Sequence, residues 1–117
     1  YLTPEENLRL VNPKADMKIL EDLGLSREES KRNIMHLSGG QRQRVAVGRA
    51  LVAPGRAILA DEPTGSLDPE MTDEVIDLLR HAAHQLGKCV IVVTHSKRVA
   101  DSADAVYTLR HKKLAKA

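Results

Sequence analysis

The fold of this chain is decided by residues 57–93, which read AILADEPTGSLDPEMTDEVIDLLRHAAHQLGKCVIVV. Short apolar runs at Ala57–Ala60 and Cys89–Val93 predict two buried strands. Between them, Asp68 followed by a proline is typical of a helix start, and an apolar face at 3.6-residue spacing continues toward Gly87. Strand, helix and strand in this order predict a βαβ unit with parallel strands and a right-handed crossover.

The residues before this unit predict short helices and no strand. Thr3–Glu6 and Ser26–Glu29 both have the capping-box pattern, in which a hydroxyl residue and a glutamate three positions later open a helix. Apolar residues at helical spacing predict another helix over about 14–23. A longer helix over 42–53 is expected to stop at Pro54.

After the βαβ unit the pattern weakens. We expect a short helix near Lys97–Ser102, a weaker strand over 105–109, and a basic, frayed tail over 110–117. The single cysteine, Cys89, excludes an internal disulfide and the usual zinc sites. Because it begins a strand expected to be buried, we interpret it as an inert, small apolar residue.

Composition narrows the class of protein. The 117 residues are enough for one domain, with 42% hydrophobic and 29% charged residues. The apolar runs are far shorter than the roughly 20 residues of a membrane-spanning helix, and no basic-then-apolar leader opens the sequence. A net charge of +2 and the absence of Phe and Trp give no reason to expect a nucleic-acid partner. The core must be built from Leu, Val, Ile and Ala.

Three polar residues follow the two predicted strands directly. Ligands of parallel sheets bind beyond the carboxyl ends of the strands, where Asp61, Glu62 and His95 fall. A carboxylate such as Asp61 suits hydrated Mg²⁺, and Glu62 can polarise a water for attack on a phosphoryl group. His95 can hydrogen-bond a phosphate. The alternative is two solvated acids and a histidine at ordinary strand ends.

A glycine pair precedes the helix over 42–53. In Ser38-Gly39-Gly40-Gln41, the glycines let backbone N–H groups approach an anion closely, and the helix dipole favours negative charge there. The hydroxyl of Ser38 can donate to a phosphate oxygen. The alternative is a serine cap with a flexible glycine turn, and for Asp68 a helix cap is likewise sufficient.

Taken together, these motifs resemble those of the ABC-type ATPases, in that family's order and at its spacing. Leu37–Gln41 is similar to the signature sequence, and Ala57–Pro63 is similar to the Walker B strand with its following acid. Ser66–Asp68 resembles the D-loop, and Thr94-His95 resembles the switch histidine. The run from Asp61 to Asp68 is most similar to the subgroup that works with lipoprotein-release, macrolide-export and cell-division permeases.

The resemblance implies an α/β fold made of a partial RecA-like P-loop NTPase core, with a parallel sheet remnant and helices, plus an N-terminal α-helical subdomain. It divides the chain into a helical subdomain with the signature over 1–55 and the C-terminal part of the core over 56–117. No Gly-x-x-x-x-Gly-Lys-Ser/Thr occurs in the sequence, so the Walker A half is absent. Without its usual phosphate-loop partner, strand 105–109 is expected to re-pair, to swap between two copies, or to be disordered.

The resemblance also implies the ATP-binding and ATP-hydrolysing subunit of an ABC transporter, on the cytoplasmic face of the membrane, with a transmembrane permease and a second nucleotide-binding domain as partners. In the family two such domains close over ATP and Mg²⁺. By this resemblance, Glu62 is the candidate base, His95 binds the γ-phosphate, and Asp61 holds Mg²⁺ through water. Ser38, Gly39 and Gly40 contact ATP across the dimer, and Gln41 supports them. Asp68 signals across the dimer interface. Lacking the phosphate loop, the chain alone is expected to turn over no ATP.

Two other functions remain open at this stage. A non-transport ABC-type ATPase of DNA repair or chromosome maintenance would carry a long coiled coil before the signature, whereas here 36 residues of predicted short helices precede it. A non-catalytic interaction module would use the same motifs only for dimer contact.

Overall fold

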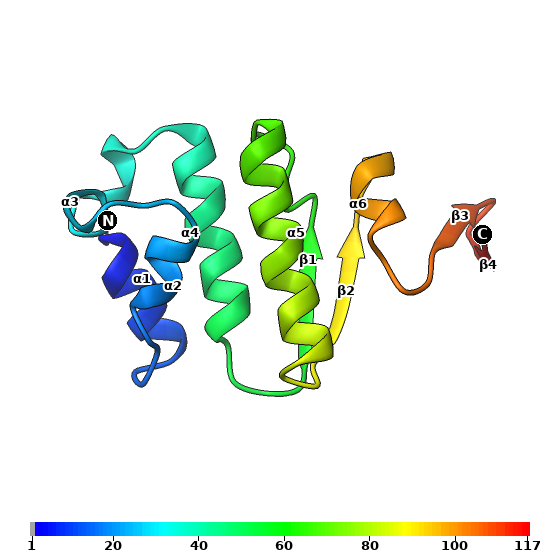
Figure 1. The fold of residues 1–117 in the computed structure, drawn as a ribbon, viewed down its shortest axis with the longest axis horizontal. Coiled ribbons are helices and arrows are strands. Elements are labelled where there is room, and N and C mark those ends of the chain that lie inside the picture. The colour runs from blue at the N-terminus through cyan, green and yellow to red at the C-terminus, as the bar shows by residue number, and fades with distance from the viewer. Residues whose placement is uncertain (1) are drawn as a thin grey trace.

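A computed structural model describes residues 2–117, and Figure 1 shows how its elements follow one another along the long axis. The helices and strands are α1 (Pro4–Val11), α2 (Lys18–Asp22), α3 (Arg27–Ser30), the 3₁₀ turn η1 (Ile34–His36), α4 (Gly39–Val52), β1 (Ala57–Asp61), α5 (Pro69–His84), β2 (Cys89–Val93), α6 (Lys97–Asp101), β3 (Tyr107–Arg110) and β4 (Lys113–Lys116). The molecule measures 43 × 27 × 24 Å. Nowhere in residues 2–117 is there a helix whose length and apolar character would let it cross a membrane.

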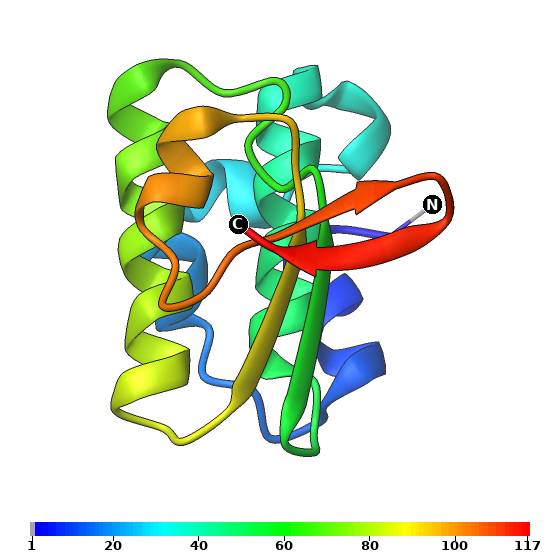
Figure 2. The same cartoon turned by 90° about the vertical axis from the view of Figure 1, so that its right-hand side faces the viewer.

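The predicted βαβ unit is present at the centre of the molecule. β1 and β2 pair in parallel, with Ala57 opposite Cys89 and Asp61 opposite Val93. α5 connects them, begins at Pro69 behind its Asp68 cap, and lies against the sheet (Figures 1 and 2). Because the last residues of the two strands are paired with each other, the residues that follow the strands lie side by side at one edge of the sheet.

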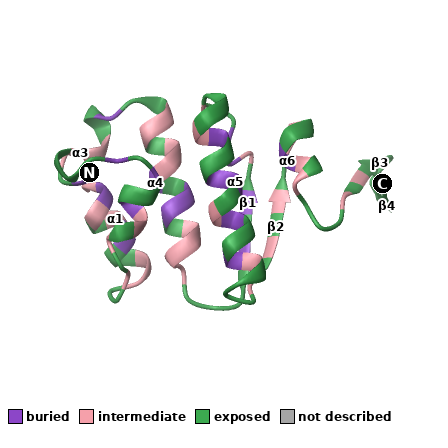
Figure 3. Cartoon of the chain, viewed as in Figure 1, coloured by how far each residue is buried: buried purple, intermediate pink, exposed green. Residues whose placement is uncertain are grey.

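The hydrophobic core lies between the helices and one face of the sheet, and the buried segments in Figure 3 follow this layer. As the composition requires, it is aliphatic; its buried members are Leu8, Leu20, Leu23, Leu25, Leu37, Val45, Val47, Ile58, Val75, Leu79 and Ala82. Gly48 of α4 permits close packing of this helix against Leu23, since a Cβ there would lie 3.1 Å from Leu23 Cδ1.

The expectation that both strands are buried is wrong for one face of the sheet. Ile58 is 2% exposed, whereas its neighbour Leu59 is 70% exposed, and Ile91 and Val93 of β2 are 52% and 53% exposed. α4 contacts β1 and α5 contacts β2, whereas the side chains that alternate to the other face, such as those of Leu59 and Ile91, stay exposed. Cys89 points to this open side and is exposed, so the interpretation of it as a buried residue is also wrong.

The helix expected over 14–23 is shorter than predicted. α2 covers only Lys18–Asp22, because polar side chains take over the backbone donors before it. Asn12 Oδ1 accepts from the Lys14 N–H at 3.0 Å, and Asp16 Oδ1 accepts from the Lys18 N–H at 2.9 Å. Such turns compete with the helix for the same N–H groups.

The tail over 110–117 is not frayed, which corrects the prediction. β3 and β4 form an antiparallel hairpin with Tyr107 opposite Lys116, and His111 and Lys112 make the turn with φ values of 50° and 64°. Of the three outcomes expected for the C-terminal strand, re-pairing is the one observed. An unpaired strand edge leaves N–H and C=O groups open, and here the next segment of the chain satisfies them.

Candidate functional site

The carboxyl edge of the β1–β2 sheet brings Glu62 and His95 into direct contact. The His95 backbone N–H donates to Glu62 Oε1 at 2.9 Å, and Thr94 Oγ1 donates to Glu62 Oε2 at 3.3 Å. The imidazole of His95 is fully exposed, with Nε2 3.8 Å from the same carboxylate oxygen. The parallel register therefore places these two predicted residues together, with a carboxylate and an imidazole facing solvent side by side.

The backbone at Glu62 is held in an unusual conformation. Its φ is 47°, in the left-handed region, which costs a residue other than glycine about 1–2 kcal/mol. The Glu62 N–H donates to Val93 O at 2.7 Å, so the ladder between β1 and β2 continues by one residue before the chain turns. The side chain stays 38% exposed, which leaves the carboxylate accessible to water. The arrangement can thus hold a water molecule at an oriented acceptor.

Asp61, the last residue of β1, lies beside this pair and is exposed. It makes no ion pair within residues 2–117, and no group of three or more His, Cys, Asp and Glu side chains that could hold a metal occurs there. A single carboxylate without a protein cage suits Mg²⁺, which keeps several waters and takes substrate phosphate oxygens as its other ligands. The role of Asp61 as the Mg²⁺ residue stays a prediction from the sequence.

The signature turn opens α4 through a reciprocal capping box. Ser38 Oγ accepts from the Gln41 N–H at 3.1 Å, and Gln41 Oε1 accepts from the Ser38 N–H at 2.9 Å. Gly39 and Gly40 occupy the first two helical positions, whose N–H groups have no partner inside a helix. A Cβ at Gly39 would have no atom within 4 Å, whereas one at Gly40 would lie 3.3 Å from the Ser66 carbonyl oxygen, so Gly39 faces open space and Gly40 packs against the turn after β1. Capping and anion binding are compatible here, because the Ser38 hydroxyl hydrogen is not used by the cap.

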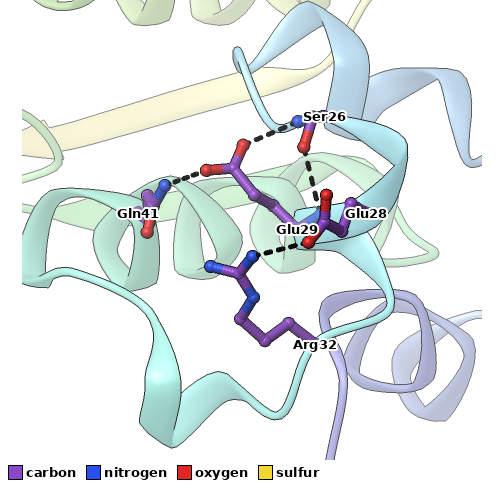
Figure 4. Close-up of polar contacts among 5 residues, drawn as sticks. All are labelled: Ser26, Glu28, Glu29, Arg32 and Gln41. Carbon is purple, nitrogen blue, oxygen red and sulfur yellow. Dashed lines mark hydrogen bonds and ion pairs between the residues drawn. The ribbon is translucent and has the colours of Figure 1, made fainter.

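A second capping box supports the first, as Figure 4 shows. The Glu29 carboxylate accepts from the Ser26 N–H at 2.8 Å through one oxygen and from the Gln41 side-chain amide through the other. The backbone N–H of Ser26 is the main reason why the pKa of Glu29 lies below its ordinary value, and the Ser26 hydroxyl and the Gln41 amide act in the same direction. The sequence predicts each box separately, but the hydrogen bond that joins them depends on tertiary packing.

Asp68 lies at the end of the turn that follows Glu62. Its carboxylate accepts from the Met71 N–H at 2.8 Å, so it caps α5 as the sequence predicts, and its side chain is exposed. The structure does not bring Asp68 into hydrogen-bond contact with Glu62 or His95.

One residue of this region, Gln43, was not predicted from the sequence. Its side-chain Nε2 donates to the Glu62 carbonyl oxygen at 2.5 Å, and its Oε1 accepts from the Ser66 N–H at 2.7 Å. It therefore joins α4 to the turn after β1. A glutamine among arginines on a helix gives no signal in the sequence, because the same pattern is typical of a solvated face.

The candidate site thus has two parts. One is the start of α4 with Ser38 and Gly39, and the other is the sheet edge where Glu62 and His95 face solvent together. The chain matches the family described as ABC transporter over residues 2–65. It belongs to this family, which confirms the resemblance found in the sequence.

Individual relatives narrow the similarity within the family. The chain is 48% identical over 95 residues to the lipoprotein-releasing system ATP-binding protein LolD of Rickettsia prowazekii, covering 80% of this chain and 42% of LolD. It is 54% identical over 74 residues to the macrolide export ATP-binding/permease protein MacB of Brucella melitensis, covering 63% of this chain and 11% of MacB. The chain therefore spans less than half the length of these relatives. The expected similarity to the lipoprotein-release and macrolide-export subgroup is confirmed.

A solved structure confirms the fold at the level of the ABC cassette. The dimeric, post-hydrolysis form of the ATP-binding cassette MJ0796, bound to ADP and Pi, superposes with a TM-score of 0.85 at 30% sequence identity. The match covers 98% of this chain and 56% of that one. The chain thus has an α/β, cassette-like fold with a parallel sheet and helices, which corresponds to part of a P-loop NTPase.

Proposed function

We propose that the chain forms the later part of the ATP-binding and ATP-hydrolysing subunit of an ABC transporter. The observation that carries the proposal is the contact between Glu62 and His95, in which the His95 N–H and the Thr94 hydroxyl orient the Glu62 carboxylate at an exposed sheet edge. An interaction module without catalysis has no need for an oriented, solvent-facing carboxylate. The chain divides into a helical subdomain over 1–55 and the C-terminal part of the RecA-like core over 56–117.

The site residues act mainly by positioning and by charge. Glu62 holds the attacking water and accepts its proton, and the exposed His95 ring donates a hydrogen bond to the γ-phosphate. The N–H groups of Gly39 and Gly40 and the Ser38 hydroxyl face the phosphates of an ATP bound mainly by a second cassette. Asp61 would hold a hydrated Mg²⁺, which would supply positive charge against the phosphate oxygens.

The proposed partners follow from the same site and from the relatives. Ser38 and Gly39 of the signature turn are exposed in this chain, and the MJ0796 relative is dimeric and bound to ADP and Pi. We therefore assign a second cassette as one partner, with Asp68 at the contact between the two. The name of LolD places that protein in a lipoprotein-releasing system, which supports a transmembrane permease as the other partner and a peripheral position on the cytoplasmic face of the membrane.

The test is the Mg²⁺-dependent ATPase activity of the full-length protein that carries this chain, compared with its Glu62→Gln variant. Glutamine keeps the acceptor for the His95 N–H but is not a base, so turnover is expected to fall by at least about 100-fold while nucleotide binding remains. Gln85→Ala, at an exposed position after α5, is the matched control and leaves turnover unchanged. Unchanged turnover in the Glu62 variant would contradict the proposed role.

A further inference from the structure

Gln43 uses both ends of its amide in a contact that spans distant parts of the chain. The side chain is half-buried and lies one turn after the signature glycines. Its Nε2 donates to the Glu62 carbonyl at 2.5 Å, and its Oε1 accepts from the Ser66 N–H at 2.7 Å. These two bonds bridge α4 and the turn that leads from Glu62 to Asp68.

The turn after Glu62 is closed by its own bonds, but these do not fix its place on α4. The Gly65 N–H donates to the Glu62 carbonyl and the Leu67 N–H donates to the Thr64 carbonyl, each at 3.2 Å. Both bonds are internal to the turn. Among residues 2–117, only the Gln43 amide ties this backbone by hydrogen bonds to the helix that carries the signature residues.

Close packing beside Gln43 supports the same contact. A Cβ on Gly40 would lie 3.3 Å from the Ser66 carbonyl oxygen, so the helix start and the turn meet at van der Waals distance. A Cβ on Gly65 would lie 3.8 Å from Gln43 Nε2. Gly40 lets the helix start approach the backbone of the turn closely, and the Gln43 amide, in ordinary contact with Gly65, then sets the relative position of the two segments.

We propose that Gln43 is a positioning residue, whose amide fixes the turn carrying Glu62 to the signature helix so that the two parts of the site keep one spacing. The effect on catalysis rests on the proposed function; the contact itself does not. The contact requires an amide, because one bond needs a side-chain donor and the other needs a side-chain acceptor at the same distance from the backbone. Glutamate keeps only the acceptor, and alanine keeps neither.

The first experiment measures amide hydrogen exchange at Ser66 in the full 117-residue chain. In Gln43→Ala the Ser66 N–H loses its partner, and its exchange is expected to accelerate about tenfold, the value of one ordinary hydrogen bond. In Gln43→Glu the carboxylate still accepts from Ser66, so protection is retained there. Core amides of α4, such as that of Val47, and all amides of Gln85→Ala serve as controls and stay unchanged.

The second experiment measures ATP turnover by the full-length protein. If Gln43 sets the spacing, Gln43→Ala lowers kcat about tenfold, with KM for ATP changed by less than about twofold, and Gln43→Glu lies between it and the wild type. A structural role alone would instead change the amount of folded protein without this ordering of kcat values.

The outcomes separate this inference from the proposed function. A full-length protein that hydrolyses no ATP overturns the proposed function, whereas the exchange at Ser66 still decides whether Gln43 fixes the turn. Unchanged Ser66 exchange in Gln43→Ala, or kcat equal to wild type in active protein, overturns the inference. If the alanine variant does not fold, Gln43→Glu decides, because loss of Ser66 protection in that variant contradicts the assigned acceptor contact.

Discussion

The signature turn (residues 38–41) and the Glu62 turn (residues 62–68) are held by different kinds of hydrogen bond. Around Ser38 the bonds are local, since donor and acceptor are three residues apart in each box. Around Glu62 they are long-range, since Gln43, Thr94 and His95 are 19 to 33 residues away in the chain. A local box forms wherever the helix forms. The Glu62 turn also has local bonds, but its position relative to α4 and β2 is fixed only when the layer of helices and sheet is assembled. Substitutions should therefore affect the stability of the two halves of the site differently.

The largest loss of stability is expected from a substitution in the core beneath the Glu62 turn. Ile58 of β1 is 2% exposed, and Ile58→Ala should lower the free energy of unfolding by about 2–5 kcal/mol, because it leaves a cavity under the strand that leads to Glu62. Leu59→Ala is the matched control on the open face, where about 0.5 kcal/mol or less is expected. Denaturant unfolding measures both, and equal losses would show that the open face is covered in solution.

An intermediate effect is expected from the local boxes. Ser26→Ala removes the acceptor for the Glu29 N–H, a bond of 3.1 Å, and should cost about 1 kcal/mol. The Glu62 turn should be unaffected, with the exchange of its amides unchanged apart from the global shift in stability. Loss of protection confined to Ser66 in this variant would show that the two regions are coupled more closely than their bonds indicate.

The smallest expected effect is the loss of folding stability at acid pH that comes from Glu29. Because the hydrogen bonds from Ser26 hold the pKa of Glu29 below its ordinary value of 4.5, the folded state favours the charged form. The resulting stability is complete above about pH 4.5 and is lost as pH falls through the lower folded pKa. Glu29→Gln should flatten this part of the pH–stability curve, whereas Glu28→Gln on the same helix should keep it. An unchanged slope in Glu29→Gln would assign the acid sensitivity to other carboxylates.

Local features of this protein could be predicted from its residues alone: the boxes at Thr3, Ser26 and Ser38, the Asp68 cap, and the parallel βαβ unit that brings Glu62 to His95. Helix caps and apolar periodicity act over a few residues, so their signals are present in the chain. The remaining features depend on how the chain packs. The Gln43 bridge, the joining of Glu29 to Gln41, the open face with Cys89 and the C-terminal hairpin depend on which segments meet. Their hydrogen bonds and exposure are set by packing between residues far apart in the sequence, and no local pattern records it.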